Sequence, residues 1–235
     1  YGSDQIKQVN PFGRKEKDQL RVEYEEIECL IAPIDRNDME LSKIELILMF
    51  IKEIRGSIRN LQEMSLNDIE LFEIKNFLIQ IEKIVPLFEE WNQQSGLKTV
   101  WFQDVSVALN LLDPEEKRIP SFYISDRYSD SLKEVREQKK KMEVALRQEL
   151  SEEKRQEYVK SRMNAVATEA ELEQEIRGQL SNQLRPFLPL MQELTNMVGR
   201  LDFLIQKARV ALKFGGTKPL LTNESIELIK VIHPE

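Results

Sequence analysis

The sequence predicts an all-α fold, a helical bundle followed by a long antiparallel two-helix coiled-coil hairpin. Three observations support this prediction. The 235 residues include only 8 glycines and 9 prolines, so few positions interrupt a helix. Apolar residues recur at spacings of three and four along most of the chain. Charged residues make up 32% of the chain, which favours long solvated helix faces over a compact globule.

The bundle is expected over residues 21–128, after a flexible polar arm at residues 1–20. Asn37 and Glu40 have the spacing of a capping box and predict the start of the first long helix. Ser121–Ser125 is the best candidate for a strand, although a short one. The helices predicted by the apolar stripes cover about 23–31 (ending before Pro33), 37–61, 65–91 and 98–112.

The hairpin is expected over residues 129–214, with arms at about 130–164 and 168–213. Thr168 and Glu171 form a capping box, which predicts that the second arm starts after a turn near 164–168. Pro186 and Pro189 predict a kink or a change of register in that arm. The residues expected to form the seam of the hairpin are Leu132, Leu146, Leu150, Leu184, Leu194, Leu201 and Ile205.

Folding the two arms about residue 166 predicts which seam residues meet. The pairs are Leu150 with Leu184, Leu146 with Leu188, and Leu132 with Leu201. Residues 215–235 are expected to form a linker and then a strand at Ser225–Ile232, whose partner strands would come from further sequence.

Charge and composition argue against several kinds of function. A net charge of −7 makes the chain a poor default binder of phosphate backbones. Cys29 and His233 are the only residues of their kinds, so an internal disulfide or a Cys/His zinc site is excluded, and a cytoplasmic location is expected. No apolar run approaches the roughly 20 residues of a membrane span, so no membrane partner is expected.

The residues of a catalytic or cofactor site are also missing. The phosphate-binding pattern GxxxxGK[ST] is absent, and Gly215–Lys218 fits a helix stop better than a phosphate loop. We therefore expect no catalytic, cofactor-binding or metal-binding residues, and no enzyme activity from this chain. Lys139, Lys140 and Lys141 form the strongest basic cluster. Interspersed glutamates favour a solvated helix face there, with DNA contact as the alternative.

Several segments, in their order along the chain, resemble one protein family. Ser65–Phe72 and Leu112–Pro114 precede a polar and aromatic turn at Tyr128 that enters a helix with the pattern Leu132-x-x-x-Arg136. Gly199–Ala211, Lys218-Pro219 and the terminal His233-Pro234 follow. Together they resemble the core and lever region of MutS-family DNA mismatch-repair ATPases over roughly residues 20–235.

The resemblance implies the core and lever part of a DNA-processing ATPase, which transmits conformational change between an ATPase domain and DNA-contacting parts. ATP and Mg²⁺ would be bound by the full-length parent, which would contact DNA and form a homodimer. This sequence differs from the family pattern because it has no Walker motifs, no β-rich clamp insertion between the arms and no Phe-x-Glu motif. These differences favour a MutS-like subgroup that lacks the clamp.

Two other interpretations stay open. The hairpin could be a stand-alone coiled-coil module that recruits a partner protein through an exposed seam. It could also bind DNA itself through Lys139–Lys141, with weak and strongly salt-dependent affinity.

Overall fold

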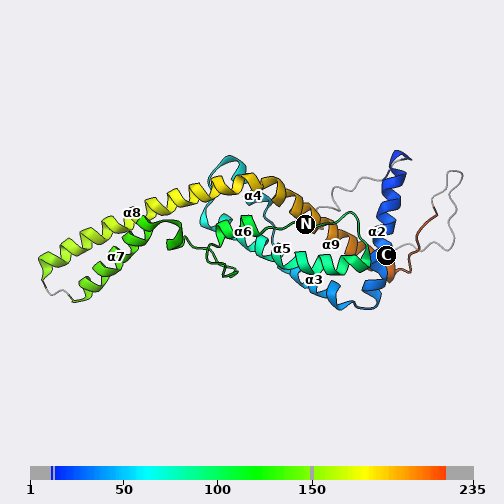
Figure 1. Ribbon diagram of the computed structural model, residues 1–235, viewed down its shortest axis with the longest axis horizontal. Coiled ribbons are helices and arrows are strands. Elements are labelled where there is room, and N and C mark those ends of the chain that lie inside the picture. Colours follow the sequence, from blue (N-terminus) through cyan, green and yellow to red (C-terminus); the bar gives the residue numbers. More distant parts are fainter. Residues whose placement is uncertain (1–11, 13, 149–150, 221–235) are drawn as a thin grey trace. The chain divides into compact units, whose positions relative to one another are not determined.

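The computed structural model describes residues 12, 14–148 and 151–220 (Figure 1). Every regular element within these ranges is helical, which confirms the all-α class. Short 3-10 helices are η1 (Arg14–Glu16), η2 (Asp126–Tyr128) and η3 (Arg185–Phe187). The α-helices are α2 (Lys17–Asp35), α3 (Met39–Phe50), α4 (Arg55–Glu63), α5 (Asp68–Ser95), α6 (Ser106–Leu112), α7 (Asp130–Gln148), α8 (Glu152–Leu184) and α9 (Leu188–Lys213).

The chain divides into two compact units that interleave along the sequence. Unit 1 takes the described parts of 1–53, 77–105 and 189–235, and unit 2 takes those of 54–76 and 106–188. Neither unit coincides with the bundle predicted over 21–128 or the hairpin predicted over 129–214. The boundary within α5 separates two stretches of one apolar helix stripe, which sequence periodicity alone reads as a single element.

The core of unit 1 is built from apolar faces of α2, α3, the second part of α5, and α9. Phe88 of α5 packs edge-on against Phe102, with ring centroids 5.0 Å apart. The centroids of the Phe88 and Trp91 rings are 6.0 Å apart. Other buried side chains in this unit are Leu30, Leu41, Ile44, Leu78, Ile81, Ile84, Leu194, Leu201, Leu204 and Ile205.

The core of unit 2 is formed by α4, the first part of α5, α6, the beginning of α7, and α8. The backbone N–H of Leu66 donates to Ser181 Oγ at 2.9 Å, so the turn before α5 is tied to α8. A buried ion pair joins Lys75 to Asp113 at 3.0 Å. The apolar residues buried here are Ile54, Ile58, Leu61, Leu71, Ile74, Leu109, Leu112, Ile124, Leu132, Ile176, Leu180 and Leu184.

The predicted helix at 37–61 is two helices. Ile51 has extended backbone angles (φ −75°, ψ 118°), which end α3, and α4 begins at Arg55 after the fully buried Ile54. The predicted cap is also displaced by one residue. Asp38, rather than Asn37, accepts from the backbone N–H groups of the first turn, and Asn37 takes a left-handed conformation with φ 52°.

The helix predicted at 98–112 is confirmed only over Ser106–Leu112. Side chains of other elements hold the preceding segment in a non-helical conformation. Glu26 accepts from the backbone N–H of Lys98 at 2.7 Å and from Thr99 Oγ1 at 2.8 Å. Glu193 accepts from Trp101 Nε1 at 2.7 Å. These bonds replace the backbone bonds that a helix would make there.

Two further predictions in this part of the chain are wrong. α2 continues through Pro33 to Asp35, because a proline near the end of a helix disturbs few backbone bonds. Ser121–Ser125 forms no strand. The backbone carbonyl of Ile124 accepts a hydrogen bond from Arg136, and the side chain of Ser125 accepts one from the backbone N–H of Arg127 and so caps η2. These bonds are not the backbone pairs of a sheet.

The predicted turn at 164–168 lies inside α8, which is continuous from Glu152 to Leu184. The chain instead passes from α7 to α8 between Gln148 and Glu152. Alanines at 165, 167 and 170 favour helix there, and they outweigh the local capping box of Thr168 and Glu171. At the prolines for which a kink or a change of register is predicted, the 3-10 helix η3 separates α8 from α9. The strand predicted at Ser225–Ile232 lies outside the described residues.

Candidate functional site

Helices α7 and α8 run side by side in opposite directions in unit 2 (Figure 1). Two ion pairs fix their register. Arg162 of α8 pairs with Glu143 of α7 at 3.1 Å, and Arg136 of α7 pairs with Glu173 of α8 at 2.7 Å. The predicted register, centred on residue 166, is therefore wrong, because α7 packs along the part of α8 that carries Arg162, Glu169 and Glu173.

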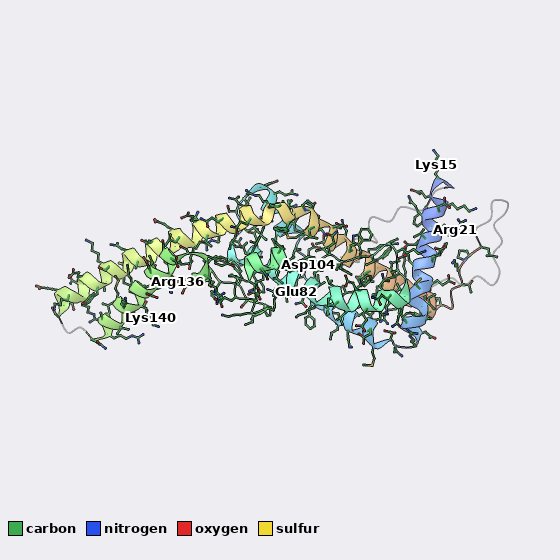
Figure 2. The ribbon with its side chains drawn as sticks, in the orientation of Figure 1. Lys15, Arg21, Glu82, Asp104, Arg136 and Lys140 are labelled. Atoms are coloured by element: carbon green, nitrogen blue, oxygen red, sulfur yellow. The ribbon has the colours of Figure 1, made fainter. Side chains whose placement is uncertain are left out.

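Arg136 is the centre of the junction where the hairpin begins (Figure 2). Its Nη1 donates to the carbonyl oxygen of Ile124 at 2.8 Å and to Asp126 Oδ1 at 2.5 Å. Its Nε donates to Glu169 Oε1 at 3.0 Å, and its Nη2 donates to Glu173 Oε1 at 2.7 Å. One guanidinium thus joins α7, α8 and the segment before η2. We call these five residues the Arg136 junction.

Burial and charge are balanced within this junction. Burial of the Arg136 guanidinium opposes its charge, but hydrogen bonds to Asp126, Glu173 and Glu169 outweigh this and raise its pKa above the usual value. Burial likewise raises the pKa of Glu169, yet hydrogen bonds from Lys139 and Arg136 lower it more strongly. The net effect is a lowered pKa for Glu169, so the carboxylate is ionised and held between two cations.

The predicted seam residues are divided between the two units. Leu132 and Leu184 are fully buried in unit 2, and Leu146 is half-buried on α7. Leu150 lies outside the described residues. The remaining three, which are buried in the core of unit 1 instead, are Leu194, Leu201 and Ile205.

The three lysines named as candidate DNA contacts differ from one another. Lys139 is half-buried and pairs with Glu169, so it belongs to the edge of the Arg136 junction. Lys140 and Lys141 are exposed on α7, and within the described ranges neither has an ion-pair partner (Figure 2).

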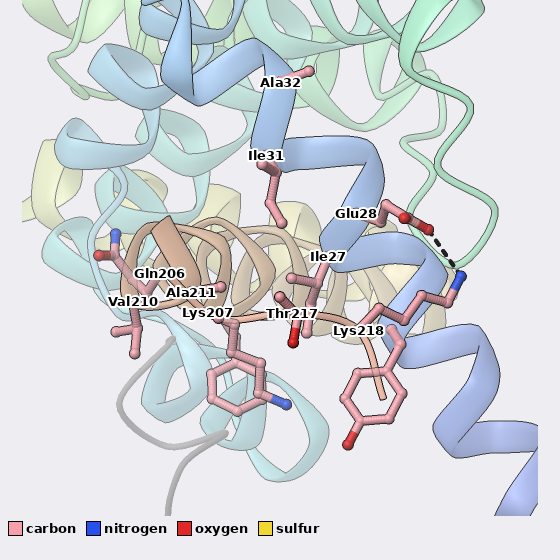
Figure 3. A pocket seen from close by; sticks show the side chains of 13 residues that line it. Ile27, Glu28, Ile31, Ala32, Gln206, Lys207, Val210, Ala211, Thr217 and Lys218 are labelled. Atoms are coloured by element: carbon pink, nitrogen blue, oxygen red, sulfur yellow. Dashed lines mark hydrogen bonds and ion pairs between the residues drawn. The ribbon is translucent and has the colours of Figure 1, made fainter. Parts of the chain in front are cut away.

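Unit 1 contains a second feature, an apolar groove between α2 and the end of α9, with a volume of about 760 Å³ (Figure 3). Its walls are Ile27 and Ile31 of α2 and Phe203 and Val210 of α9, with Tyr24 and Ala211. An ion pair of 2.8 Å between Glu28 and Lys218 crosses its rim.

One buried acid of α2 holds the two walls of this groove together. Glu23, which is 5% exposed, accepts hydrogen bonds from Arg200 and Lys207 of α9. Burial raises the pKa of Glu23, but the hydrogen bonds from those two cations lower it by more, so the net effect is a lowered pKa. The ammonium of Lys207 also lies 4.2 Å from the centre of the Phe203 ring, a favourable cation–π distance.

Sequence reasoning missed both polar clusters. The partners of Arg136 that lie on α8 are 33 and 37 residues away, and those of Glu23 on α9 are more than 170 residues away. The only local signal is the spacing of Glu23 and Glu26, which places two acids on one face of α2 amid apolar residues.

Within the described ranges, no group of three or more His, Cys, Asp or Glu side chains gathers as a metal ion would require. None of the helices that the structure describes is both long and apolar enough to cross a membrane. No protein-family model matches the chain, and no curated protein is significantly similar to it in sequence.

Proposed function

We propose that this chain is the core and lever region of a MutS-like DNA-processing ATPase. Its task is to pass conformational change between an ATPase domain and the parts that contact DNA. ATP and Mg²⁺ bind elsewhere in the full-length protein, which acts in the cytoplasm, binds DNA and forms a homodimer. The proposal rests on the sequence resemblance, and the Arg136 junction supports it.

The supporting observation concerns the pattern Leu132-x-x-x-Arg136, which is part of the resemblance. Leu132 is fully buried, and the guanidinium of Arg136 makes four hydrogen bonds that join three segments. Both residues of the pattern therefore hold the base of α7 against its neighbours, as a lever would require. A junction of this kind favours movement of the hairpin as one body over bending at its base.

The dimensions of the hairpin suit this role. Helix α8 has 33 residues, which corresponds to about 50 Å at 1.5 Å per residue. A stiff element of this length converts a small rotation at one end into a displacement of several ångströms at the other.

Reading the gene beyond the codon for Glu235 tests this proposal without any assay. We expect a phosphate-loop pattern, GxxxxGK[ST], within about 60 residues, on a predicted strand followed by a helix. A stop codon, or a continuous reading frame of that length without the pattern, would contradict the proposal.

The alternative function, a coiled-coil module that recruits a partner protein, is favoured by one observation. Val159, Met163 and Val166 are between 42% and 66% exposed, at spacings of four and three on the outer face of α8. A partner helix could pack on such a stripe. Under this alternative, Met163→Asp abolishes capture of the partner, whereas the lever function predicts little effect.

A further inference from the structure

Helix α3 in unit 1 is apolar on two opposite faces. Leu41 and Ile44 are buried, and Leu48 lies on the same side of the helix. The opposite side carries Met39, Leu46 and Phe50, at intervals of seven and four residues. A second apolar side of this kind is normally buried, so the outer side of α3 is a candidate contact surface within the described part of the chain.

The outer face is unusually exposed for its composition. Met39 is 74% exposed, Leu46 56%, Met49 81% and Phe50 61%. If a fully exposed large side chain offers about 200 Å², these four present about 500 Å² of apolar surface. Patches of about this size on a monomer are often functional. We call these four residues the α3 face.

A hollow of about 410 Å³ lies directly beside this face. Leu48 and Met49 form one side of it, and Val198 and Ile205 of α9 form the other. The surface therefore has protruding side chains next to a depression that could receive them. A contact between two identical surfaces related by a twofold axis needs this combination, because each copy supplies both parts.

The charges around the face also suit an identical partner. Glu45 pairs with Arg209 at the hollow, at 2.6 Å, and Lys43 pairs with Glu40 on α3, at 2.8 Å. Asp202 also lines the hollow. Side chains of both charge signs are present, and most of these side chains are already in ion pairs, so two such faces can meet without large like-charge repulsion.

We propose that the α3 face binds the α3 face of a second copy of this chain, with protruding side chains of each copy seated in the hollow of the other. The four side chains alone would bury about 1,000 Å² in total, which is near the lower limit for a specific interface. A dimer with a micromolar dissociation constant is expected. The inference does not depend on the lever function, and either one can fail without the other.

Sedimentation velocity of the 235-residue chain from about 1 to 100 µM tests this interface. We expect a reversible dimer, whose dissociation constant rises at least tenfold in Phe50→Asp and, separately, in Met49→Asp. Met64→Asp is the matched control, because Met64 is also an exposed methionine, at 52%, but lies at the end of α4 in unit 2. This control should leave the dissociation constant unchanged.

A cysteine variant provides an independent measurement that does not rely on weakened binding. In a Cys29→Ser background, Leu46→Cys should form a disulfide-linked dimer under mild oxidation, whereas Met64→Cys should not. A chain that stays monomeric at 100 µM would overturn the proposal. A dimer that Phe50→Asp and Met49→Asp leave intact, and that Leu46→Cys does not crosslink, would also overturn it.

Discussion

At the scale of single residues, charged side chains determine where elements pack and where they end. Glu26 and Glu193 hold residues 98–103 in a non-helical conformation, and Arg136 fixes the base of the hairpin. Charge-assisted hydrogen bonds contribute roughly 1.5–3 kcal/mol each when partly buried. Apolar periodicity cannot indicate such bonds, because their partners are distant in the sequence.

The lowered pKa of Glu169 predicts how the stability of unit 2 depends on pH. A carboxyl whose pKa falls on folding contributes stability above its unfolded pKa, near 4.5, and loses that contribution as the pH falls through the folded value. Urea unfolding should therefore show Glu169→Gln less stable than the unmodified chain by about 1–2 kcal/mol at pH 7. The difference should shrink as the pH falls below about 4.5.

Glu171→Gln is the control for this pH dependence, because Glu171 is exposed on the same helix and has no described ion-pair partner. Its stability should follow that of the unmodified chain at every pH. A constant difference between Glu169→Gln and the unmodified chain from pH 7 to pH 3 would show that the ionised carboxylate contributes nothing to the junction.

Sequence reasoning succeeded at the residue scale where burial follows from pattern. Leu132 and Leu184 were expected to be buried and are fully buried. It could not distinguish the members of the lysine cluster, where three adjacent residues of one type have different surroundings. Lys139 differs from Lys140 and Lys141 because Glu169 lies opposite it on α8, and no local pattern reports that acid.

At the scale of elements, the existence of the long helices was predictable and many of their ends were not. The apolar stripe that reads as one helix at 37–61 continues across the break at Ile51, since an extended residue in the chain can still bury its side chain. The turn predicted at 164–168 rested on a capping box, which is a signal of about 1 kcal/mol. Packing of α8 through the buried residues Ala165, Ile176 and Leu180 can exceed such a signal.

The displaced cap of α3 gives a prediction at this scale. Asp38 accepts from the backbone N–H groups of Glu40 and Leu41, at 3.0 and 3.1 Å. Asp38→Ala should therefore destabilise the chain by about 1 kcal/mol, measured as a shift of the urea midpoint.

Asn37→Gly tests whether Asn37 contributes to the same cap. Asn37 has φ 52°, a conformation that glycine adopts without strain, so stability should be kept or slightly increased. If Asn37→Gly were as damaging as Asp38→Ala, the cap would be Asn37, as the sequence pattern suggested.

At the scale of the whole molecule, the all-α fold class was predictable from the sequence, but the register in which the hairpin helices pair was not. Two amphipathic arms can be folded about any point that keeps apolar residues facing each other, so a register centred on residue 166 satisfied the pattern. The actual register depends on Arg136, Glu169 and Glu173, together with Arg162 and Glu143. The division into two units was also hidden, because α5 carries one uninterrupted pattern through both.

The proposed lever function makes the Arg136 junction the part of the molecule through which coupling must pass. Arg136→Lys keeps the positive charge, but a single ammonium cannot replace the planar fork that joins Ile124, Asp126, Glu169 and Glu173. Arg147→Lys is the matched control, since it makes the same change at an exposed arginine of the same helix. Circular dichroism should confirm that both variants are folded.

The most direct measurement is ATP hydrolysis by the full-length protein, with and without DNA, for the unmodified protein and these two variants. We predict that Arg136→Lys keeps the basal rate of hydrolysis within about twofold. The change in rate that DNA induces should fall by about fivefold or more, a coupling loss of about 1 kcal/mol. Arg147→Lys should keep both the basal rate and the response to DNA. A folded Arg136→Lys variant with an unchanged response to DNA would contradict the central claim that the hairpin junction transmits the signal.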